Sequence, residues 1–170
     1  MILLILIAAL LVLLCFAGVL LVGAPYVPTL TPQVEAALEL ANVMPNQTLL
    51  ELGCGDGKVL IAAAQTGALA VGYELNPFLV LIAWLRTRRF KGRVRVKWGN
   101  FWQAEWPEVQ AIFVFLHPRF MKRLDTKVIQ YKHKPVKLVS FAFAVPDRTP
   151  AAQKNNVYCY EYAEPLSPGQ

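Results

Sequence analysis

The sequence from residue 48 to residue 57 is Thr48-Leu-Leu-Glu-Leu-Gly-Cys-Gly-Asp-Gly57. A short apolar run includes one carboxylate, Glu51, and glycine then occupies every second position before an apolar helical pattern begins at Val59. Glycine tolerates positive φ and has no Cβ, so a ligand can approach the backbone closely. This order predicts a strand, a tight turn and a helix, an arrangement that holds nucleotide-like ligands against bare backbone.

A second carboxylate, Glu74, lies in the segment Val71-Gly-Tyr-Glu-Leu-Asn76. It follows the glycines by about 20 residues, the spacing at which a carboxylate can accept hydrogen bonds from two ribose hydroxyls. The glycine pattern is E-x-G-x-G-x-G and differs from the dinucleotide pattern G-x-G-x-x-G. An acid before the turn would repel a pyrophosphate but could hold a cationic group. The pattern therefore favours an adenosyl ligand with a cationic end.

The rest of the chain alternates between strand and helix signals. Asn76 followed by Pro77 predicts a helix start, as does Thr31 followed by Pro32. The alternation predicts a parallel α/β sheet with helices on both faces. We expect strands at 48–53, 68–75, 93–98, 111–116, 137–144 and 157–162, and helices at 33–42, 58–66, 77–90 and 119–131.

The carboxyl ends of the predicted strands concentrate polar and aromatic residues. They offer Glu51 with the glycine turn, then Glu74, then Asn100, and finally His117. Ligands of open parallel sheets bind at this edge. These residues therefore predict one elongated pocket.

Several residues at this edge allow two interpretations. Trp98, Phe101 and Trp102 could flank an adenine ring or a methylammonium, or could be ordinary core residues. His117 could be a strand-end residue without a catalytic role, or its imidazole could orient or deprotonate an incoming amine. Cys54 is interpreted as a small filler of the turn rather than a nucleophile.

An apolar run without charge extends from Ile2 to Val22. About 20 apolar residues are enough to cross a bilayer as a helix. A cleaved signal peptide is the alternative, but no basic residue precedes the run, and the small residues after it lead directly into Pro25. The run therefore predicts a retained transmembrane anchor.

Basic residues are unevenly distributed along the chain. There are 17 Lys and Arg against 11 Asp and Glu, and the first of the basic residues is Lys58. This favours a domain on the cytoplasmic side of the membrane. Basic groups at 86–97 and 119–137 are interpreted as a face beside an anionic membrane, with a nucleic-acid or acidic-partner surface as the alternative. Three cysteines provide no disulfide framework and suit a reducing compartment.

The segment Glu51-Leu-Gly-Cys-Gly-Asp-Gly57, with Glu74 and Asn100, resembles the motifs of class I S-adenosylmethionine-dependent methyltransferases. Most of the chain is similar to a narrower family, the membrane-anchored lysine methyltransferases of the ATP synthase c subunit and the adenine nucleotide translocase, with their prokaryotic relatives. The narrower resemblance depends on Pro25-Tyr-Val-Pro-Thr29, Gly55-Asp-Gly-Lys58, Gly72-Tyr-Glu-Leu-Asn-Pro77, Phe115-Leu-His-Pro118 and the strand around Phe141. His117 and the short C-terminus differ from the family pattern.

The resemblance implies a Rossmann-like class I methyltransferase sheet with helices on both faces, preceded by one N-terminal transmembrane helix. The implied divisions are an anchor at 1–24, a linker and helix closing over the cofactor at 25–47, the methyltransferase domain at 48–164 and a tail at 165–170. The implied cofactor is S-adenosylmethionine, with no metal. The residues expected to bind it are Thr29, Glu51, Gly53, Cys54, Gly55, Glu74, Leu75, Asn76, Asn100 and Phe101, with Gln33 also at the closing edge.

Within this set, the expected contacts are Glu51 near the methionine amino group, Glu74 on the ribose and Asn100 at the adenine edge. His117 is the candidate catalytic residue. The sequence His117-Pro-Arg-Phe120 lacks the acid or amide that enzymes methylating adenine or glutamine have there, so adenine N6 methylation is not expected.

The function implied is protein-lysine N-methylation of a membrane or membrane-proximal protein by a single-pass enzyme with a cytoplasmic catalytic domain. Two alternatives stay open: an RNA methyltransferase, and a membrane protein that binds S-adenosylmethionine without turnover.

Overall fold

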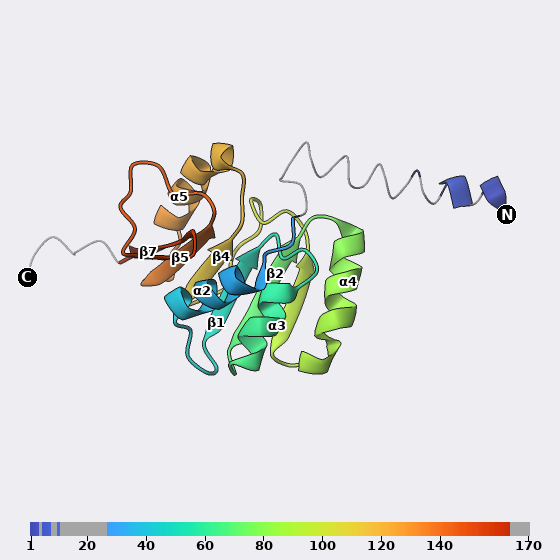
Figure 1. Cartoon of the computed structure of the whole chain (residues 1–170), viewed down its shortest axis with the longest axis horizontal. Coiled ribbons are helices and arrows are strands. Elements are labelled where there is room, and N and C mark those ends of the chain that lie inside the picture. The colour runs from blue at the N-terminus through green and yellow to red at the C-terminus, as the bar shows by residue number, and fades with distance from the viewer. Residues whose placement is uncertain (4, 8–9, 11–26, 164–170) are drawn as a thin grey trace, which may run out of the picture.

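The computed structural model describes residues 1–3, 5–7, 10 and 27–163. Its described part forms a seven-stranded sheet in the order β3-β2-β1-β4-β5-β7-β6 (Figure 1). The strands are β1 (Thr48–Leu52), β2 (Leu69–Glu74), β3 (Val94–Trp98), β4 (Ala111–Val114), β5 (Val136–Phe141), β6 (Ala152–Lys154) and β7 (Val157–Tyr162). The helices are α2 (Thr31–Ala41), α3 (Lys58–Gln65), α4 (Pro77–Thr87) and α5 (Met121–Ile129), with 3-10 turns η1 (Arg88–Phe90) and η2 (Pro118–Phe120).

The first five strands are parallel, with β1 between β2 and β4, as the sequence predicts. The expectation of a parallel sheet is wrong for β7, which runs antiparallel to both of its neighbours, β5 and β6. β6 is a short exposed strand that the sequence analysis did not predict. Asn155 and Asn156 join β6 to β7 with φ of 49° and 61°. Two consecutive positive φ values give the turn that suits a two-residue hairpin.

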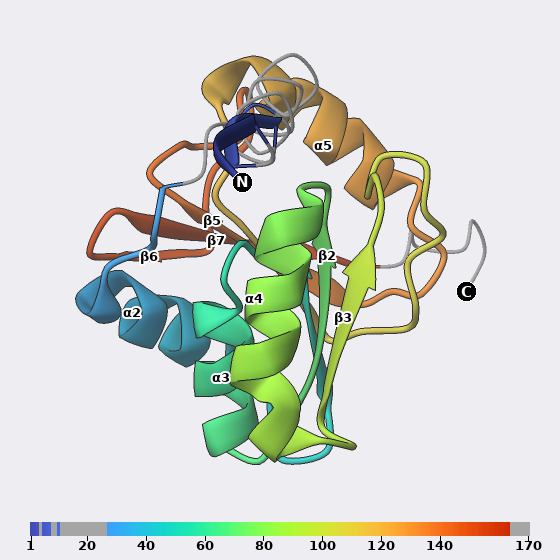
Figure 2. The same ribbon diagram turned by 90° about the vertical axis from the view of Figure 1, so that its right-hand side faces the viewer.

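One face of the sheet is covered by α2, α3 and α4; in Figure 2, α3 and α4 lie to the left of β2 and β3. Strand residues that point to this face, such as Leu49, Phe113 and Val139, pack with Val34 of α2 and Leu60 of α3. Successive strand residues point to opposite faces, so the next residue along each strand contributes to the other side.

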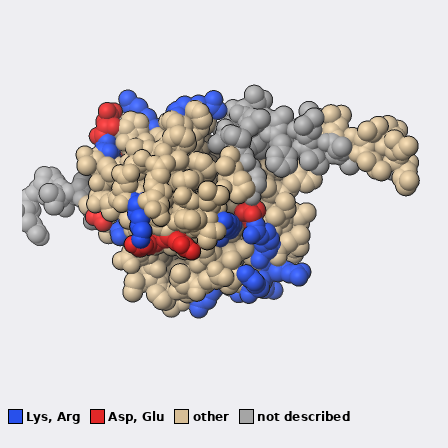
Figure 3. Space-filling view, viewed as in Figure 1, with Lys and Arg blue, Asp and Glu red and all other residues tan. Residues whose placement is uncertain are grey.

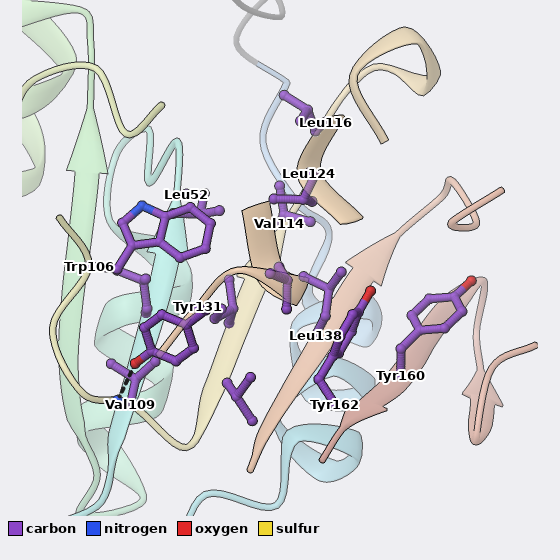
Figure 4. Packing of buried hydrophobic residues seen from close by; sticks show 14 of the residues in the cluster. Leu52, Trp106, Val109, Val114, Leu116, Leu124, Tyr131, Leu138, Tyr160 and Tyr162 are labelled. Atoms are coloured by element: carbon purple, nitrogen blue, oxygen red, sulfur yellow. Dashed lines mark hydrogen bonds between the residues drawn. The ribbon is translucent and has the colours of Figure 1, made fainter. Parts of the chain in front are cut away.

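The opposite face is covered by α5 and by the irregular segment 99–110 (Figure 4). Leu124 of α5 packs with Val114 and Leu138, and Trp106 of the irregular segment packs in the same cluster beside Leu52. Helices therefore cover both faces, as expected. No helix lies between β3 and β4 in the described chain, and aromatic side chains cover that part of the sheet instead.

The helix starts are only partly as predicted. Asn76 caps α4, because its side-chain oxygen accepts the N–H of Phe78 at 2.9 Å. Thr31 was predicted as the cap of α2 and this is wrong: Leu30 holds that position without a side-chain bond. The Thr31 hydroxyl instead accepts a hydrogen bond from the Lys58 ammonium at 3.1 Å.

The predicted anchor at Ile2–Val22 and the tail at 165–170 lie largely or wholly outside the described residues. Within the part of the chain that is described, no helix is both long enough and apolar enough to cross a membrane.

Candidate functional site

The glycine turn after β1 has the conformation that its sequence predicts. Gly53, Gly55 and Gly57 have φ of 81°, 52° and 80°. The N–H groups of Gly53 and Cys54 both donate to the Tyr73 carbonyl at 2.9 Å, which ties the turn to β2. A Cβ built on Gly53 would meet no atom within 4 Å, so open space lies against the backbone at this point.

Gly72 in β2 allows the turn to pack closely on the sheet. A Cβ at this position would lie 2.6 Å from Leu60 and 2.7 Å from the Cys54 sulfur. Cys54 is buried, and this burial, with Glu51 and Glu74 nearby, raises the pKa of its thiol. A buried thiol that stays protonated agrees with the interpretation of Cys54 as a filler.

The Glu74 carboxylate connects the glycine turn to the start of α4. One oxygen accepts the N–H of Gly55 at 2.9 Å, and the other accepts the N–H groups of Leu75 and Asn76, both at 2.8 Å. Glu74 is only 7% exposed. The structure therefore brings three other predicted site residues together around the Glu74 carboxylate.

Glu51 lies in β1 at the base of this site and is 5% exposed. Burial, and then the nearby negative charge of Glu74, raise its pKa well above the usual range of a glutamate. Its Oε2 atom has no hydrogen-bond partner. A buried carboxyl oxygen without a partner is available to a donor that the protein itself does not supply.

Three buried side-chain polar atoms lack a partner in the described chain: Gln33 Oε1, Glu51 Oε2 and Asn76 Nδ2. They belong to the first turn of α2, to β1 and to the cap of α4. Lys58 links the α2 end to the glycine turn, because its ammonium donates to the Thr29 carbonyl at 2.8 Å. Buried polar groups are rarely left unpaired, and each unpaired group costs about 1–3 kcal/mol. Two of the unpaired atoms belong to residues beside Glu74, and the third belongs to the helix that Lys58 ties to the glycine turn, so together they indicate a ligand site at this edge of the sheet.

Asn100 follows β3, and its side-chain oxygen accepts the N–H of Trp102 at 2.9 Å. The rings of Phe101 and Trp102 lie 4.7 Å apart and pack against the core, which agrees with the core interpretation of both residues. Trp98 is 70% exposed, and its indole N–H donates to the Leu75 carbonyl at 3.0 Å. Trp98, and Asn100 two residues after it, therefore lie beside the segment Leu75–Asn76, whose N–H groups donate to Glu74.

His117 follows β4, is exposed, and begins the turn η2. Its Nδ1 atom accepts the N–H of Arg119 at 3.3 Å. Because Nδ1 accepts, a neutral ring in this arrangement has its proton on Nε2. The imidazole thus has a capping role in the fold, and its catalytic role stays a prediction.

The sequence profile described as the ANTKMT methyltransferase domain matches residues 51–152. The chain belongs to this family. The match covers all the predicted site residues except Thr29 and Gln33, and the resemblance noted in the sequence is confirmed.

Proteins similar to this ANTKMT-family chain are also named as lysine methyltransferases. It is 30% identical over 128 residues to the Homo sapiens lysine N-methyltransferase named for the ATP synthase c subunit, covering 74% of this chain and 54% of that protein. It is 30% identical over 125 residues to a protein-lysine N-methyltransferase of Saccharolobus islandicus, covering 71% of this chain and 78% of that protein. The chain spans about half the length of the vertebrate relatives that it matches.

Among solved structures, an RNA methyltransferase from Salinibacter ruber in complex with S-adenosyl-L-homocysteine superposes with a TM-score of 0.78. The two chains are 28% identical, and the superposition covers 84% of this chain and 98% of that one. The Rossmann-like methyltransferase fold predicted from the sequence is therefore confirmed.

The ANTKMT-family match also includes an aromatic cluster that the sequence analysis did not place in the site. The ring of Phe115 lies 4.6 Å from that of Phe141 and 6.3 Å from that of Phe143, and the His117 ring lies 6.4 Å from Phe143. These residues lie at the carboxyl ends of β4 and β5. The only sequence signal is the alternation of Phe141 and Phe143, which also suits an ordinary strand.

Proposed function

We propose that this chain is an S-adenosylmethionine-dependent methyltransferase that methylates lysine side chains of a protein at or in a membrane. The observation that supports it best is the group of unpaired buried atoms of Gln33, Glu51 and Asn76. In a chain of this family, Glu51 and Asn76 lie beside Glu74, and Gln33 lies in the helix whose first residue is bound by Lys58 next to the glycine turn.

The residues present fit this cofactor. The unpaired oxygen of Glu51 suits the ammonium of the methionine part, and the open space at Gly53 suits a chain lying along the backbone. A carboxylate has about four acceptor sites, so Glu74 can hold its three backbone donors and still accept one ribose hydroxyl. Asn100 and Phe101 would border the adenine. When bound, S-adenosylmethionine supplies a methyl group on a positively charged sulfur.

The acceptor side of the site is proposed at the Phe115, Phe141 and Phe143 cluster. A lysine amine must lose its proton before it can accept a methyl group. Apolar surroundings disfavour the charged form and so lower the pKa of a lysine. The phenylalanine rings would provide such surroundings and align the amine, while His117 lies at their rim. Few essential catalytic side chains are then needed, because alignment provides much of the rate.

We also propose that residues 1–24 form a single membrane anchor with the catalytic domain on the cytoplasmic side. The support is the uncharged run from Ile2 to Val22 in the sequence. The described chain resumes at Val27 and meets the domain next to the glycine turn, where the Lys58 ammonium donates to the Thr29 carbonyl. An anchor connected there would hold the site near the membrane surface, where the acceptor lysines would be.

RNA methylation is the second candidate. The similar structure from Salinibacter ruber is described as an RNA methyltransferase, and the basic groups at 86–97 and 119–137 would suit a polyanion. The homologues named for lysine methylation favour the protein substrate.

The first test is binding of S-adenosylmethionine, measured by calorimetry and by the shift in melting temperature. We expect binding by the wild type and its loss in Glu51→Ala. Glu105→Gln, which changes an exposed glutamate, is the matched control. Absence of binding by the wild type would contradict the proposal.

The second test is transfer of a radiolabelled methyl group to solubilised host membranes and to total RNA. Label on a protein band, at lysine by mass spectrometry, is the expected result. Label on RNA alone would establish the second candidate, and binding without any transfer would identify a non-catalytic protein.

A further inference from the structure

Helix α4 presents an unusually apolar face to solvent. Its buried side is narrow and consists of Leu79, Ala83 and Thr87. Leu81 and Leu85 follow Leu79 and Ala83 by two residues, which is about 200° around the helix axis, and both are exposed. The exposed apolar residues are Leu81 (53%), Ile82 (43%), Trp84 (59%) and Leu85 (45%). Exposed apolar residues on a single helix at this density mark an interaction surface.

A strongly basic segment follows this apolar face directly. Between Glu74 and Glu105 the sequence contains no acidic residue, and the basic ones are Arg86, Arg88, Arg89, Lys91, Arg93, Arg95 and Lys97. Of these, only Arg86 forms an ion pair within the described chain, with Asp56. Figure 3 shows blue side chains gathered where the lower end of α4 lies in Figure 1. The apolar face and the positive charge thus adjoin.

This combination suits one partner best. A helix with aliphatic residues and a tryptophan on its outer side, followed by arginines, has the composition of helices that lie in the interface of an anionic bilayer. RNA could bind the arginines, but its phosphates would make no favourable contact with the exposed Leu81, Ile82 and Leu85. A second copy of this chain would bring the same positive charges against each other.

We propose that the outer face of α4 binds the surface of an anionic lipid bilayer, with Leu81, Trp84 and Leu85 entering the interface and Arg88 and Arg89 contacting lipid headgroups. This contact is separate from the proposed N-terminal anchor and from cofactor binding. It would fix the orientation of the domain on the membrane, which an anchor at one end of the chain does not do alone.

The test uses the full chain reconstituted into phosphatidylcholine vesicles whose acyl chains are brominated, with and without phosphatidylglycerol. Bromine quenches only tryptophans that reach the acyl region, so the N-terminal run does not contribute. We expect quenching in the anionic vesicles and its loss in Trp84→Phe. Leu81→Gln/Leu85→Gln and Arg88→Gln/Arg89→Gln should lower quenching to the level of Trp84→Phe. Ile129→Gln, which changes an exposed aliphatic residue of α5, should leave it unchanged.

Retention of cofactor binding and of the melting temperature checks that each variant folds. Quenching that Trp84→Phe leaves unchanged, or that does not depend on phosphatidylglycerol and the arginines, overturns the proposal. Dimers in lipid-free solution that Leu81→Gln/Leu85→Gln dissociates would assign the face to a second copy instead. Binding of a labelled RNA that depends only on the arginines, without quenching of Trp84, would assign it to nucleic acid.

Discussion

The Glu74 carboxylate accepts the backbone N–H of Gly55 at 2.9 Å, across 19 residues of sequence. The end of β2 thereby fixes the shape of the turn that follows β1. The same carboxylate accepts the N–H groups that begin α4. A single acid thus positions the glycine turn, the strand end and a helix start, and these are the three parts that would enclose the cofactor.

Replacing Glu74 by glutamine should therefore weaken S-adenosylmethionine binding. The amide has one acceptor oxygen, and its NH₂ group would face backbone donors. Hydrogen bonds to a charged group contribute about 1.5–3 kcal/mol, so we expect the Kd to rise about 10- to 100-fold. Calorimetric titration measures this, with the exposed Glu105→Gln as control. An unchanged Kd would remove Glu74 from the site.

Cofactor binding should depend on pH through Glu51. Burial raises its pKa, so the free protein keeps a proton there above the usual range of a glutamate. The ammonium of S-adenosylmethionine would favour the carboxylate, so binding should release a proton and strengthen as pH rises towards the raised pKa. Calorimetry in buffers of different ionisation enthalpy detects the proton. In Glu51→Gln both the release and the pH dependence should vanish.

The raised pKa of Glu51 should also make the free energy of unfolding depend on pH. The folded state binds a proton that the unfolded chain has released, so the free energy of unfolding should fall as pH rises from about 4.3, the usual pKa, to the raised value. Urea titrations of the ligand-free protein and of Glu51→Gln should therefore diverge over this range. A contribution that instead grew with pH would contradict the assignment of a raised pKa.

Gly72→Ala should displace the glycine turn, because Gly72 of β2 packs against Cys54 of that turn. The new methyl group would lie 2.6 Å from Leu60 and 2.7 Å from Cys54, and overpacking of this kind costs about 1–3 kcal/mol. We expect a lower free energy of unfolding together with weaker cofactor binding, because Cys54 belongs to the turn.

Two variants control the Gly72→Ala experiment. Gly92→Ala lies in a turn with open space around it and should cost stability without changing cofactor affinity. Cys54→Ala/Gly72→Ala removes the clashing sulfur and should recover part of both losses. If the double variant is no better than the single one, the clash with the Cys54 sulfur is not the cause, and the contacts with Leu60 and the Cys54 Cβ atom, which both remain, account for the losses.

Much of the ligand edge could be predicted because its determinants are local. Glycine at positive φ and Asn76 as a cap before proline each impose a conformation within a few residues of themselves, and the carboxylate at the end of β2 is identifiable from its spacing to the glycines. The parallel core followed from the alternation of strand and helix patterns, since each pattern reflects burial by its own element.

What could not be predicted depends on contacts between distant residues. The side chain of Thr31 does not cap α2, and its hydroxyl instead accepts a hydrogen bond from Lys58, which lies 27 residues away in the sequence. The antiparallel direction of β7 depends on the lack of a crossover helix after β5 and on a short hairpin with β6, whose three exposed residues have no strand pattern. Likewise, the meeting of Phe115 with Phe143 depends on the order of β4 and β5 in the sheet.

Tyr131→Phe should destabilise the segment that replaces a helix between β3 and β4. The Tyr131 hydroxyl accepts the N–H of Val109 at 2.9 Å (Figure 4) and donates to the Pro107 carbonyl. Val109 is 1% exposed, so the variant would leave a buried donor unpaired, at about 1–3 kcal/mol. The melting temperature should fall by about 2–4 °C per kcal/mol in a chain of this size. Tyr158→Phe, which loses only an exposed hydrogen bond to Asn156, should leave the melting temperature nearly unchanged. Equal decreases in the two variants would show that burial of the Val109 N–H does not determine the loss of stability.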